Sequence, residues 1–424
     1  MVTKETPSNV VNSVLESLEI GDDGLRVYSK KFIDNLNNNI KILKLSAKAV
    51  LGGSLAKGTF LKEGFDVDVF VRFDKKYKDE ELSELLEKVL KKSELKYLRV
   101  HGSRDYFQIK DKRVFEIVPV LKVNSWKEAK NVADMSPLHV SYFNKKAGND
   151  EKIRNQIRLT KMFMKSIGIY GAESYIKGFS GHVADILILQ HGTFLNLIKK
   201  ASKWKERTII DIEKHQKHPE MTMNESKIVS PLIVVDPVQE DRNASAALSK
   251  ENYFLFIKKC NEFLKKPSIE YFKIKRFDEK IAEHLNKLKE PVKNFIISIT
   301  PLKGKKDVIG TKVMKIKEFL EASLEKNDFN VNSSFWEFDP EKSRMLFSIK
   351  NETLSEKKIH KGPEKNMKIH VDNFKKKYKD AYTKEGVFYA NVKRKYTLPE
   401  NFIKAIISDK YVAEKCKSIS VKSL

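Results

Sequence analysis

Two aspartates two residues apart inside a run of branched apolar residues restrict the fold of this chain more than any other feature. The run over residues 66–71 reads Asp-Val-Asp-Val-Phe-Val. Branched residues in alternation favour a strand, in which Asp66 and Asp68 project from one face while the valines point into the core. A carboxylate among apolar strand residues is costly unless it is paired or binds a metal. We therefore expect a strand that carries functional carboxylates.

A third carboxylate and a glycine–serine turn complete the candidate site. Glu116 lies in a second apolar strand segment, residues 114–120, and Gly53-Ser54 follows the strand segment 47–51. Taken alone, an Asp-x-Asp pair is usually a solvated strand face and a Gly-Ser pair is usually a turn. Three converging carboxylates would instead form a site for two Mg²⁺ ions, because Mg²⁺ prefers hard oxygen ligands.

Hydrophobic periodicity divides the chain into three parts. Residues 1–140 mix strands with helices, residues 150–265 are helical, and a mixed pattern returns after Pro267. The expected strands cover residues 47–51, 65–73, 97–100, 114–120, 295–299, 334–338, 344–349 and 386–393. The expected helices cover residues 82–90, 151–167, 182–199, 249–265, 313–324 and 371–379.

The charge of the chain indicates a polyanionic partner. The formal net charge is +25 at pH 7, and residues 151–424 carry +20 of it. The excess thus lies outside the segment that holds the carboxylates, as expected if the later part of the chain binds a nucleic-acid backbone. A lysine-rich genome would produce the same excess without such a partner, so charge alone leaves both interpretations open.

The cysteines indicate a reducing compartment. The apolar runs argue against a secretion signal and a membrane span. Cys260 and Cys416 are far apart and lack metal-ligating neighbours, so neither a disulfide framework nor a zinc site is expected. Acidic residues interrupt the apolar positions of the first 25 residues, which argues against a secretion signal. No apolar run approaches the length of a membrane span, and the sequence predicts a cytoplasmic protein without a membrane partner.

Six short stretches give the chain a specific resemblance to a known family. They follow one another over residues 50–250 in an order that resembles the archaeal-type (class I) CCA-adding enzymes, which are tRNA nucleotidyltransferases of the polymerase-β-like superfamily. The stretches are Gly-Ser-Leu-Ala-Lys-Gly-Thr-Phe-Leu at 53–61, Asp-Val-Asp-Val-Phe at 66–70, Gly-Ile-Tyr-Gly-Ala-Glu at 168–173, Gly-Phe-Ser-Gly at 178–181, Asp-Pro-Val at 236–238 and Asp-Arg-Asn at 241–243.

The resemblance implies an α+β multidomain fold. A polymerase-β-like catalytic head would occupy residues 1–145, a helical nucleotide-recognition neck residues 146–266, and an α/β body and tail that binds tRNA residues 267–424. The tail, which ends soon after Tyr411, is shorter than is usual in the family.

The resemblance also implies a reaction and its site. The enzyme would add C, C and A to the 3′ end of tRNA from CTP and ATP, with release of pyrophosphate. Asp66, Asp68 and Glu116 would be the catalytic residues and would hold two Mg²⁺ ions. The implied nucleotide-binding residues are Gly53, Ser54, Lys57, His139, Lys161, Tyr170 and Arg242, of which Arg242 would read the base.

Two of these positions depart from the family pattern. Glu116 stands where the family typically has Asp, which adds one methylene group. Lys57 stands where Arg is commoner, so that a point charge replaces a planar fork. Both departures retain the charge, and activity is still expected.

Several other residues have a structural interpretation. Arg154 and Lys165 belong to a basic stripe on the 151–167 helix, and for them a solvated face is favoured. The stretch 179–181 and Trp204 are expected to pack or to form turns rather than to catalyse.

Basic residues near the C-terminus are candidates for RNA contact. A solvated charge run is nearly as good an interpretation, and the tyrosines among them could either stack on RNA or pack in a core. The basic candidates are Lys375, Lys376, Lys377, Lys393, Arg394 and Lys395, and the tyrosines are Tyr378, Tyr389 and Tyr396.

Two other functions stay open on the sequence. A poly(A) or oligo(A) polymerase of the same superfamily would share the catalytic residues and act on another acceptor. A catalytically inactive RNA-binding protein would have no reason to retain buried carboxylates, so Asp66, Asp68 and Glu116 argue against it. The oligomeric state is not determined, and a homodimer is compatible with the sequence.

Overall fold

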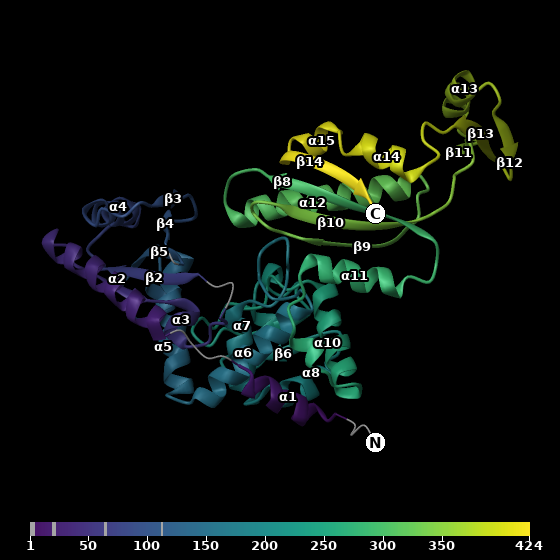
Figure 1. Ribbon diagram of the computed structural model, residues 1–424. Coiled ribbons are helices and arrows are strands. Elements are labelled where there is room, and N and C mark those ends of the chain that lie inside the picture. The colour runs from purple at the N-terminus through teal and green to yellow at the C-terminus, as the bar shows by residue number, and fades with distance from the viewer. Residues whose placement is uncertain (1–4, 19–22, 63–65, 112) are drawn as a thin grey trace. The chain divides into compact units, whose positions relative to one another are not determined.

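The computed structural model describes residues 5–18, 23–62, 66–111 and 113–424 (Figure 1). The chain divides into two compact units, Met1–Ile274 and Lys275–Leu424. The first unit contains two large hydrophobic clusters, one around a sheet and one among helices. Each unit is described by itself below.

The first cluster forms around a mixed five-stranded sheet in the order β1-β2-β5-β4-β3. Strands β2 and β5 are parallel, and the other neighbouring pairs are antiparallel. The strands are β1 (Ala47–Leu51), β2 (Val67–Phe73), β3 (Leu98–Val100), β4 (Tyr106–Lys110) and β5 (Val114–Leu121). The sequence anticipated four of them but not β4, and Phe65, the expected first residue of the second strand, lies outside the described residues.

Two helices cover one face of this sheet, α2 (Asp23–Ile42) and α4 (Leu82–Lys92). The alternation in β2 places Val67, Val69 and Val71 in the core with these helices, all with no exposed surface. Asp68 is consequently directed to the opposite face, because successive strand residues point to opposite sides. The expected orientation of the strand is confirmed.

The second cluster of the first unit is helical. Buried side chains of α1 (Pro7–Glu16) pack there with those of the later helices, although residues 1–145 were expected to form one domain. The other helices are α5 (Ser136–Ala147), α6 (Glu151–Ser166), α7 (Gly181–His191), α8 (Phe194–Ala201), the short α9 (Pro219–Thr222) and α10 (Lys250–Lys265). Two short parallel strands, β6 (Thr208–Ile210) and β7 (Leu232–Val234), complete this part.

The expected single helix over residues 182–199 is wrong, because the segment forms α7 and α8. The chain turns at Gly192, whose φ of 76° lies in the left-handed region that glycine adopts at low cost. Thr193 then caps α8 by accepting a hydrogen bond from the backbone N–H of Asn196. α7 is buried on most sides, whereas α8 buries one face with Phe194, Leu197 and Ile198, and the apolar residues on both sides of the break continue one helical pattern.

The second unit contains two antiparallel sheets and five helices among the described residues. One sheet has the order β14-β8-β10-β9 and the other the order β11-β13-β12, and Figure 1 shows the smaller sheet with α13 at one end of this unit. The strands are β8 (Val292–Pro301), β9 (Val331–Glu337), β10 (Ser343–Lys350), β11 (Lys357–Glu364), β12 (Tyr382–Lys384), β13 (Val387–Lys393) and β14 (Cys416–Ser423). The helices are α11 (Phe277–Lys287), α12 (Lys306–Lys326), α13 (Lys368–Lys377), α14 (Pro399–Ile406) and α15 (Lys410–Ala413).

The architecture confirms the expected α+β multidomain fold. All four strands and both helices expected after Pro267 are present, with ends shifted by up to seven residues. Within the described part of the chain, none of the helices combines the length and the apolar composition needed to cross a bilayer.

Candidate active site

Neighbouring strands bring the carboxylates to one face of the sheet. Asp68 on β2 lies opposite Glu116 in the parallel register with β5, and Glu116 lies opposite Gln108 on β4. The Nε2 group of Gln108 donates a hydrogen bond of 2.7 Å to Oε1 of Glu116, which orients that carboxylate. Asp66 directly precedes β2. The three acidic residues therefore border one region on this face of the sheet.

The electrostatics of this region favour a bound cation. Burial, reinforced by the charges of Glu116 and Asp66 and opposed by that of Lys57, raises the pKa of Asp68 to about 7. Burial, together with Glu116 and Asp66, also raises the pKa of Tyr106 on β4, to about 12. These shifts report a region of concentrated negative charge. Three hard oxygen donors in such a region fit a divalent metal such as Mg²⁺.

The three carboxylates are not drawn tightly together. Among the described residues, the group whose ligand atoms all lie within 4.8 Å of one another is His139, His182 and Asp236, not the acidic set on the sheet. Repulsion between like charges favours the wider spacing of the carboxylates.

The Gly52-Gly53 turn lies directly against Asp68. Gly53 begins the short helix α3 (Gly53–Lys57) with a φ of 52°, and a Cβ atom at this position would lie 1.6 Å from Oδ2 of Asp68. The backbone N–H of Gly52 also donates to the carbonyl of Asp68, at 2.8 Å. Only glycine allows this approach, so that the turn, Ser54 and the carboxylate lie side by side.

Two lysines expected at the nucleotide share one carboxylate. Nζ of Lys57 lies 2.8 Å from Oδ2 of Asp185 on α7, and Nζ of Lys161 on α6 lies 3.7 Å from Oδ1. Lys161 also donates hydrogen bonds to the carbonyl and the hydroxyl of Thr59, at 3.1 and 2.9 Å. The side chains of all three charged residues are at most 8% exposed. Two buried positive charges thus face a single negative charge.

Burial and charge act in opposite directions in this cluster. Burial lowers the pKa of Lys161 to about 8, although the charge of Asp185 acts against this shift and that of Lys57 reinforces it. Burial alone would raise the pKa of Asp185, but the two lysines outweigh it and hold the pKa below its ordinary value. The cluster is suited to a further anion, because its net charge is positive.

The basic stripe on α6 supports the segment that follows α3. Nε of Arg154 donates to the carbonyl of Lys57 at 2.9 Å, and the buried Arg158 donates to the carbonyls of Gly58 and Phe60. The expectation of a solvated face at Arg154 is therefore wrong, because its guanidinium group binds backbone carbonyls.

Tyr170 and Lys165 lie close to each other. Nζ of Lys165 lies 5.4 Å from the centroid of the Tyr170 ring. Burial, followed by the charge of Asp185, raises the pKa of Tyr170 above its ordinary value. A Cβ atom on Gly181 would lie 2.9 Å from the Tyr170 hydroxyl, so this hydroxyl lies at the first turn of α7.

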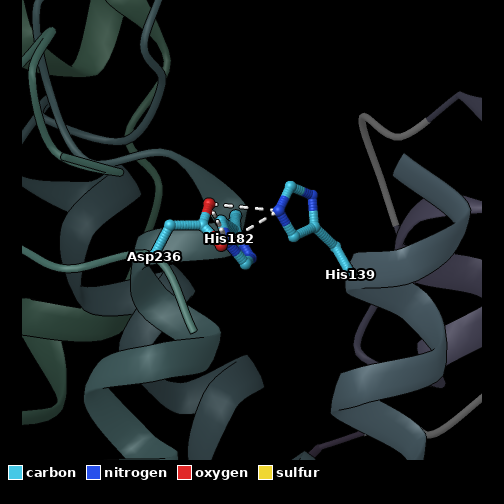
Figure 2. A group of neighbouring side chains, drawn as sticks. All are labelled: His139, His182 and Asp236. Carbon is cyan, nitrogen blue, oxygen red and sulfur yellow. Dashed lines mark hydrogen bonds and ion pairs between the residues drawn. The ribbon is translucent and has the colours of Figure 1, made fainter. Parts of the chain in front are cut away.

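The remaining nucleotide candidates, His139 and Arg242, meet at Asp236, and Figure 2 shows His139 there with His182. Nε2 of His139 on α5 and Nε2 of His182 on α7 lie 3.0 and 3.2 Å from Oδ2 of Asp236. Arg242 donates to the same oxygen at 2.6 Å. We call these four residues the Asp236 cluster. Asp236 itself is completely buried.

The Asp236 cluster has the properties of a hydrogen-bonded group. Burial lowers the pKa of His182 to about 4, so its ring is neutral at pH 7. Burial would raise the pKa of Asp236, but hydrogen bonds from His139 and His182 hold it below its usual range. Two imidazoles and a carboxylate could ligate a metal such as zinc. The guanidinium of Arg242 instead supplies the positive charge on Oδ2, which disfavours a cation there.

The candidate RNA-contacting residues lie in the second unit. Lys375, Lys376 and Lys377 end α13, and all three are exposed. Lys393 and Lys395 are also exposed, whereas Arg394 pairs with Asp328 at 2.6 Å.

The tyrosines near these basic residues make ring contacts within the second unit. The Tyr378 ring lies 4.8 Å from that of Phe374, and the Tyr389 ring lies 5.9 Å from that of Tyr382. Tyr396 packs against Phe402, with 5.6 Å between ring centroids. These contacts provide the packing interpretation considered for the tyrosines.

The packing and turn roles expected for the stretch 179–181 and for Trp204 are confirmed. Phe179 is 1% exposed and belongs to the helical core. Ser180 accepts a hydrogen bond from the backbone N–H of Val183 and so caps α7. Trp204 stacks on Tyr253, with 5.7 Å between ring centroids.

Sequence reasoning assigned no site role to four residues of this region, which are Gln108, His182, Asp185 and Asp236. Asp185 and His182 both lie on α7, which is otherwise apolar from Val183 to Leu189. An acidic residue inside an apolar helix was the available signal for Asp185, since a buried charge requires a partner. For His182 no comparable signal exists, because a single histidine at a helix start is common.

Three family models match the chain in succession. They are a nucleotidyltransferase domain at residues 30–133, the second domain of tRNA nucleotidyltransferase at residues 155–273 and the C-terminal domain of the CCA-adding enzyme at residues 296–418. Together they span most of both units.

Similar proteins of known name lead to the same family. The CCA-adding enzyme of Nanoarchaeum equitans is 35% identical over 82% of this chain and 84% of its own length. The CCA-adding enzyme of Methanocaldococcus jannaschii is 29% identical over 96% of this chain and 91% of its own length.

A solved structure shares the fold at low sequence identity. The Cid1 poly(U) polymerase with Mg 3′-dATP bound superposes with a TM-score of 0.50 and 13% identity, over 62% of this chain and 98% of that chain. This likeness concerns the fold alone. The three successive domain matches and the relative that is 35% identical over most of both chains show that this chain belongs to the CCA-adding enzyme family of tRNA nucleotidyltransferases.

Proposed function

We propose that this protein adds C, C and A, without a template, to the 3′ end of tRNA, using CTP and ATP. The observation that carries the proposal is the placement of Asp68 opposite Glu116, beside the turn at Gly53, in a member of this family. Carboxylates beside a glycine turn are what nucleotidyl transfer requires, because the reaction needs metal ligands next to a phosphate-binding backbone.

The acidic residues would hold the metal and the turn would bind the triphosphate. Asp66, Asp68 and Glu116 would bind two Mg²⁺ ions, which when bound lower the pKa of the RNA 3′-hydroxyl and neutralise the departing pyrophosphate. The hydroxyl of Ser54 and nearby backbone N–H groups would bind phosphate oxygens. Gln108 keeps the Glu116 carboxylate oriented toward the site.

Three further side chains would bind the triphosphate. Lys57 and Lys161 provide positive charge that a single Asp185 does not fully neutralise. The Tyr170 hydroxyl and Nζ of Lys161 both lie close to the position that a Cβ atom on Gly181 would occupy. The two groups are therefore near each other. A triphosphate would complete the charge balance of this group, as an anion does beside paired cations.

Arg242 would select the base, and His139 would contact the nucleotide. Arginine only donates hydrogen bonds, so it can serve the ring nitrogen acceptors of C and A but not the protonated ring nitrogens of U and G. The side chain of Arg242 is 34% exposed, and therefore it is accessible to an incoming nucleotide.

The domains would divide these tasks. Residues 1–145 would form the catalytic head, residues 146–266 the nucleotide-recognition neck, and residues 267–424 the body and tail that bind tRNA. The family matches at 30–133, 155–273 and 296–418 support this division. The basic candidates for tRNA contact are Lys375, Lys376, Lys377, Lys393, Arg394 and Lys395.

One assay tests the function. Purified protein is incubated with Mg²⁺ and tRNA that lacks its CCA end, with CTP and ATP supplied separately and together, and the products are sequenced. We expect two C residues from CTP alone and the complete CCA end from both nucleotides. Long runs of A on tRNA or on unrelated RNA would identify a poly(A) polymerase instead, and no incorporation at all would contradict the proposal.

A further inference from the structure

The side chain of Asp236 connects three segments that are distant in the sequence. Its Oδ2 atom accepts hydrogen bonds from His139 on α5, from His182 on α7 and from Arg242 in its own loop. The rings of His139 and His182 are 4.1 Å apart, and Figure 2 shows His139 reaching Asp236 from the opposite helix. The carboxylate is therefore the point at which both helices and the loop meet.

Asp236 also determines the conformation of the loop that carries Arg242. Oδ1 of Asp236 accepts hydrogen bonds from the backbone N–H groups of Val238 and Gln239, at 2.9 and 3.3 Å. The backbone N–H of Asp236 donates to the carbonyl of Arg242 at 2.9 Å, and that of Arg242 donates to the carbonyl of Gln239 at 3.0 Å. Arg242 is thus held to Asp236 through its backbone and through its guanidinium.

The anchored guanidinium keeps part of its hydrogen-bonding capacity. NH1 of Arg242 is bound to Asp236, while within the described part of the chain no other partner of this guanidinium is observed. Because His182 is neutral at pH 7, it hydrogen-bonds to Asp236 without cancelling the charge that attracts Arg242. A free arginine would lose considerable rotamer entropy on binding a ligand, and an anchored one loses less.

From these contacts we infer that Asp236 and His182 are positioning residues for base selection, acting through Arg242. This inference rests on the proposed function, in which Arg242 reads the base. Asp236 fixes the guanidinium so that one edge faces the incoming nucleotide, and His182 restrains the carboxylate from α7. A guanidinium free to reorient would serve the acceptors of U and G as readily as those of C and A. Selectivity, rather than triphosphate binding, is therefore the property that these two residues control.

The test compares nucleotide selectivity in the full-length protein. The variant Asp236→Asn keeps the shape of the side chain and removes its charge. We expect the ratio of kcat/KM for CTP to that for UTP to fall about tenfold or more, as the loss of a charge-assisted hydrogen bond implies. Inhibition by inorganic triphosphate, which has no base, should change less than about twofold, since the triphosphate site is unaffected.

Two further variants keep the test decisive. The variant His182→Asn removes one of the donors to the carboxylate and should reduce the same ratio by a smaller factor, even if Asp236→Asn fails to fold. Asp241→Asn is the matched control, because Asp241 lies in the same loop but pairs with Lys227 and is 48% exposed. We expect it to leave the ratio unchanged. Melting temperatures show which variants are folded.

The possible outcomes separate the inference from the proposed function. If the wild type prefers CTP to UTP and folded variants at Asp236 or His182 retain the full preference, the inference is overturned. The proposed function is unaffected by that outcome. Weaker inhibition by triphosphate with unchanged selectivity would also overturn the inference, because Asp236 would then support phosphate binding. A wild-type protein without any preference for CTP would overturn the inference and the proposed function together.

Discussion

The ammonium group of Lys57 lies 2.8 Å from a carboxylate oxygen of Asp185, and both side chains are less than a tenth exposed. Lys57 ends α3, the short helix after β1, whereas Asp185 comes from α7. The pair thus joins the part of the first unit that carries the proposed catalytic carboxylates to the helical part. Lys161 shares the same carboxylate, so the group has an excess of positive charge.

Replacement of Asp185 by Asn should destabilise the protein and increase its dependence on nucleotide. Removing one partner of a buried ion pair costs about 3–5 kcal/mol, because an uncompensated charge remains. A bound triphosphate would supply the missing negative charge, so the rise in melting temperature on addition of CTP should be larger than in the wild type. Thermal denaturation with and without CTP measures both effects.

The control for this substitution is Asp278→Asn. Asp278 is 74% exposed and pairs with Arg344 at 2.7 Å. Exposed pairs contribute about 0–1 kcal/mol, so we expect little change in melting temperature. An equally small change in Asp185→Asn would show that the buried pair does not have the assigned importance.

The rate of nucleotide addition should depend on pH through Lys161. Its pKa of about 8 means that the ammonium form loses its proton as the pH rises from 7 to 9. The kcat/KM for CTP should therefore decrease along the alkaline limb, since this parameter reports groups in the free enzyme. In Lys161→Met that limb should disappear and kcat/KM should be low at every pH. Lys152→Met, an exposed change on the same helix, should keep the wild-type profile.

Loss of a carboxylate that is proposed to bind metal should abolish catalysis but not tRNA binding. Asp66→Ala and Asp68→Ala should each reduce nucleotide addition about 1000-fold or more, because the metals stabilise the transition state by several kcal/mol. Affinity for tRNA should change little, since it derives mainly from phosphate contacts elsewhere. Wild-type turnover in either variant would contradict the assigned site.

The change Glu116→Asp refines this assignment. Aspartate is the residue that the family typically has at this position, and we expect activity at or above that of the parent. The shorter side chain would withdraw from Gln108, whose hydrogen bond to Glu116 is 2.7 Å long. Complete inactivity would therefore show that the strand geometry here has adapted to glutamate.

Removal of the Arg242 side chain should reduce fidelity. Arg242→Ala should lower the use of CTP and ATP together and raise the relative incorporation of UTP. A charge-assisted hydrogen bond contributes about 1.5–3 kcal/mol, which corresponds to roughly 10- to 150-fold in discrimination. Competition assays with labelled CTP and UTP measure the ratio. If triphosphate affinity falls while fidelity is unchanged, Arg242 binds phosphate instead of the base.

Salt dependence should reveal whether the end of α13 contacts RNA. Replacing Lys375, Lys376 and Lys377 by Ala should weaken tRNA binding and flatten the dependence of affinity on salt, by about one unit of slope for each phosphate that is no longer neutralised. Lys91 and Lys92, exposed at the end of α4, provide a control pair whose replacement should leave the slope unchanged. An unaltered slope in the triple variant would assign the run to solvent.

The local sequence determined the strands that carry the carboxylates. Alternating branched residues around Asp66 and Asp68 leave a strand as the favoured conformation, and the same holds around Glu116. The break at Gly192 was missed because apolar residues on both sides of it continue one helical pattern, which gave no sign of a turn. Strand β14 was also missed, although Ile419 and Val421 alternate there with polar residues as in a half-buried strand.

The tertiary structure alone decided which charges meet. Asp185 is 128 residues from Lys57, and Asp236 is 97 residues from His139. Pattern reasoning describes neighbours within one helix or strand, where spacing determines the shared face. Partners brought together by packing have no such spacing, so neither the ion pair nor the Asp236 cluster could be read from local pattern. The sequence determined which side chains can form a nucleotidyltransferase site, and packing decided which buried charges stabilise one another there.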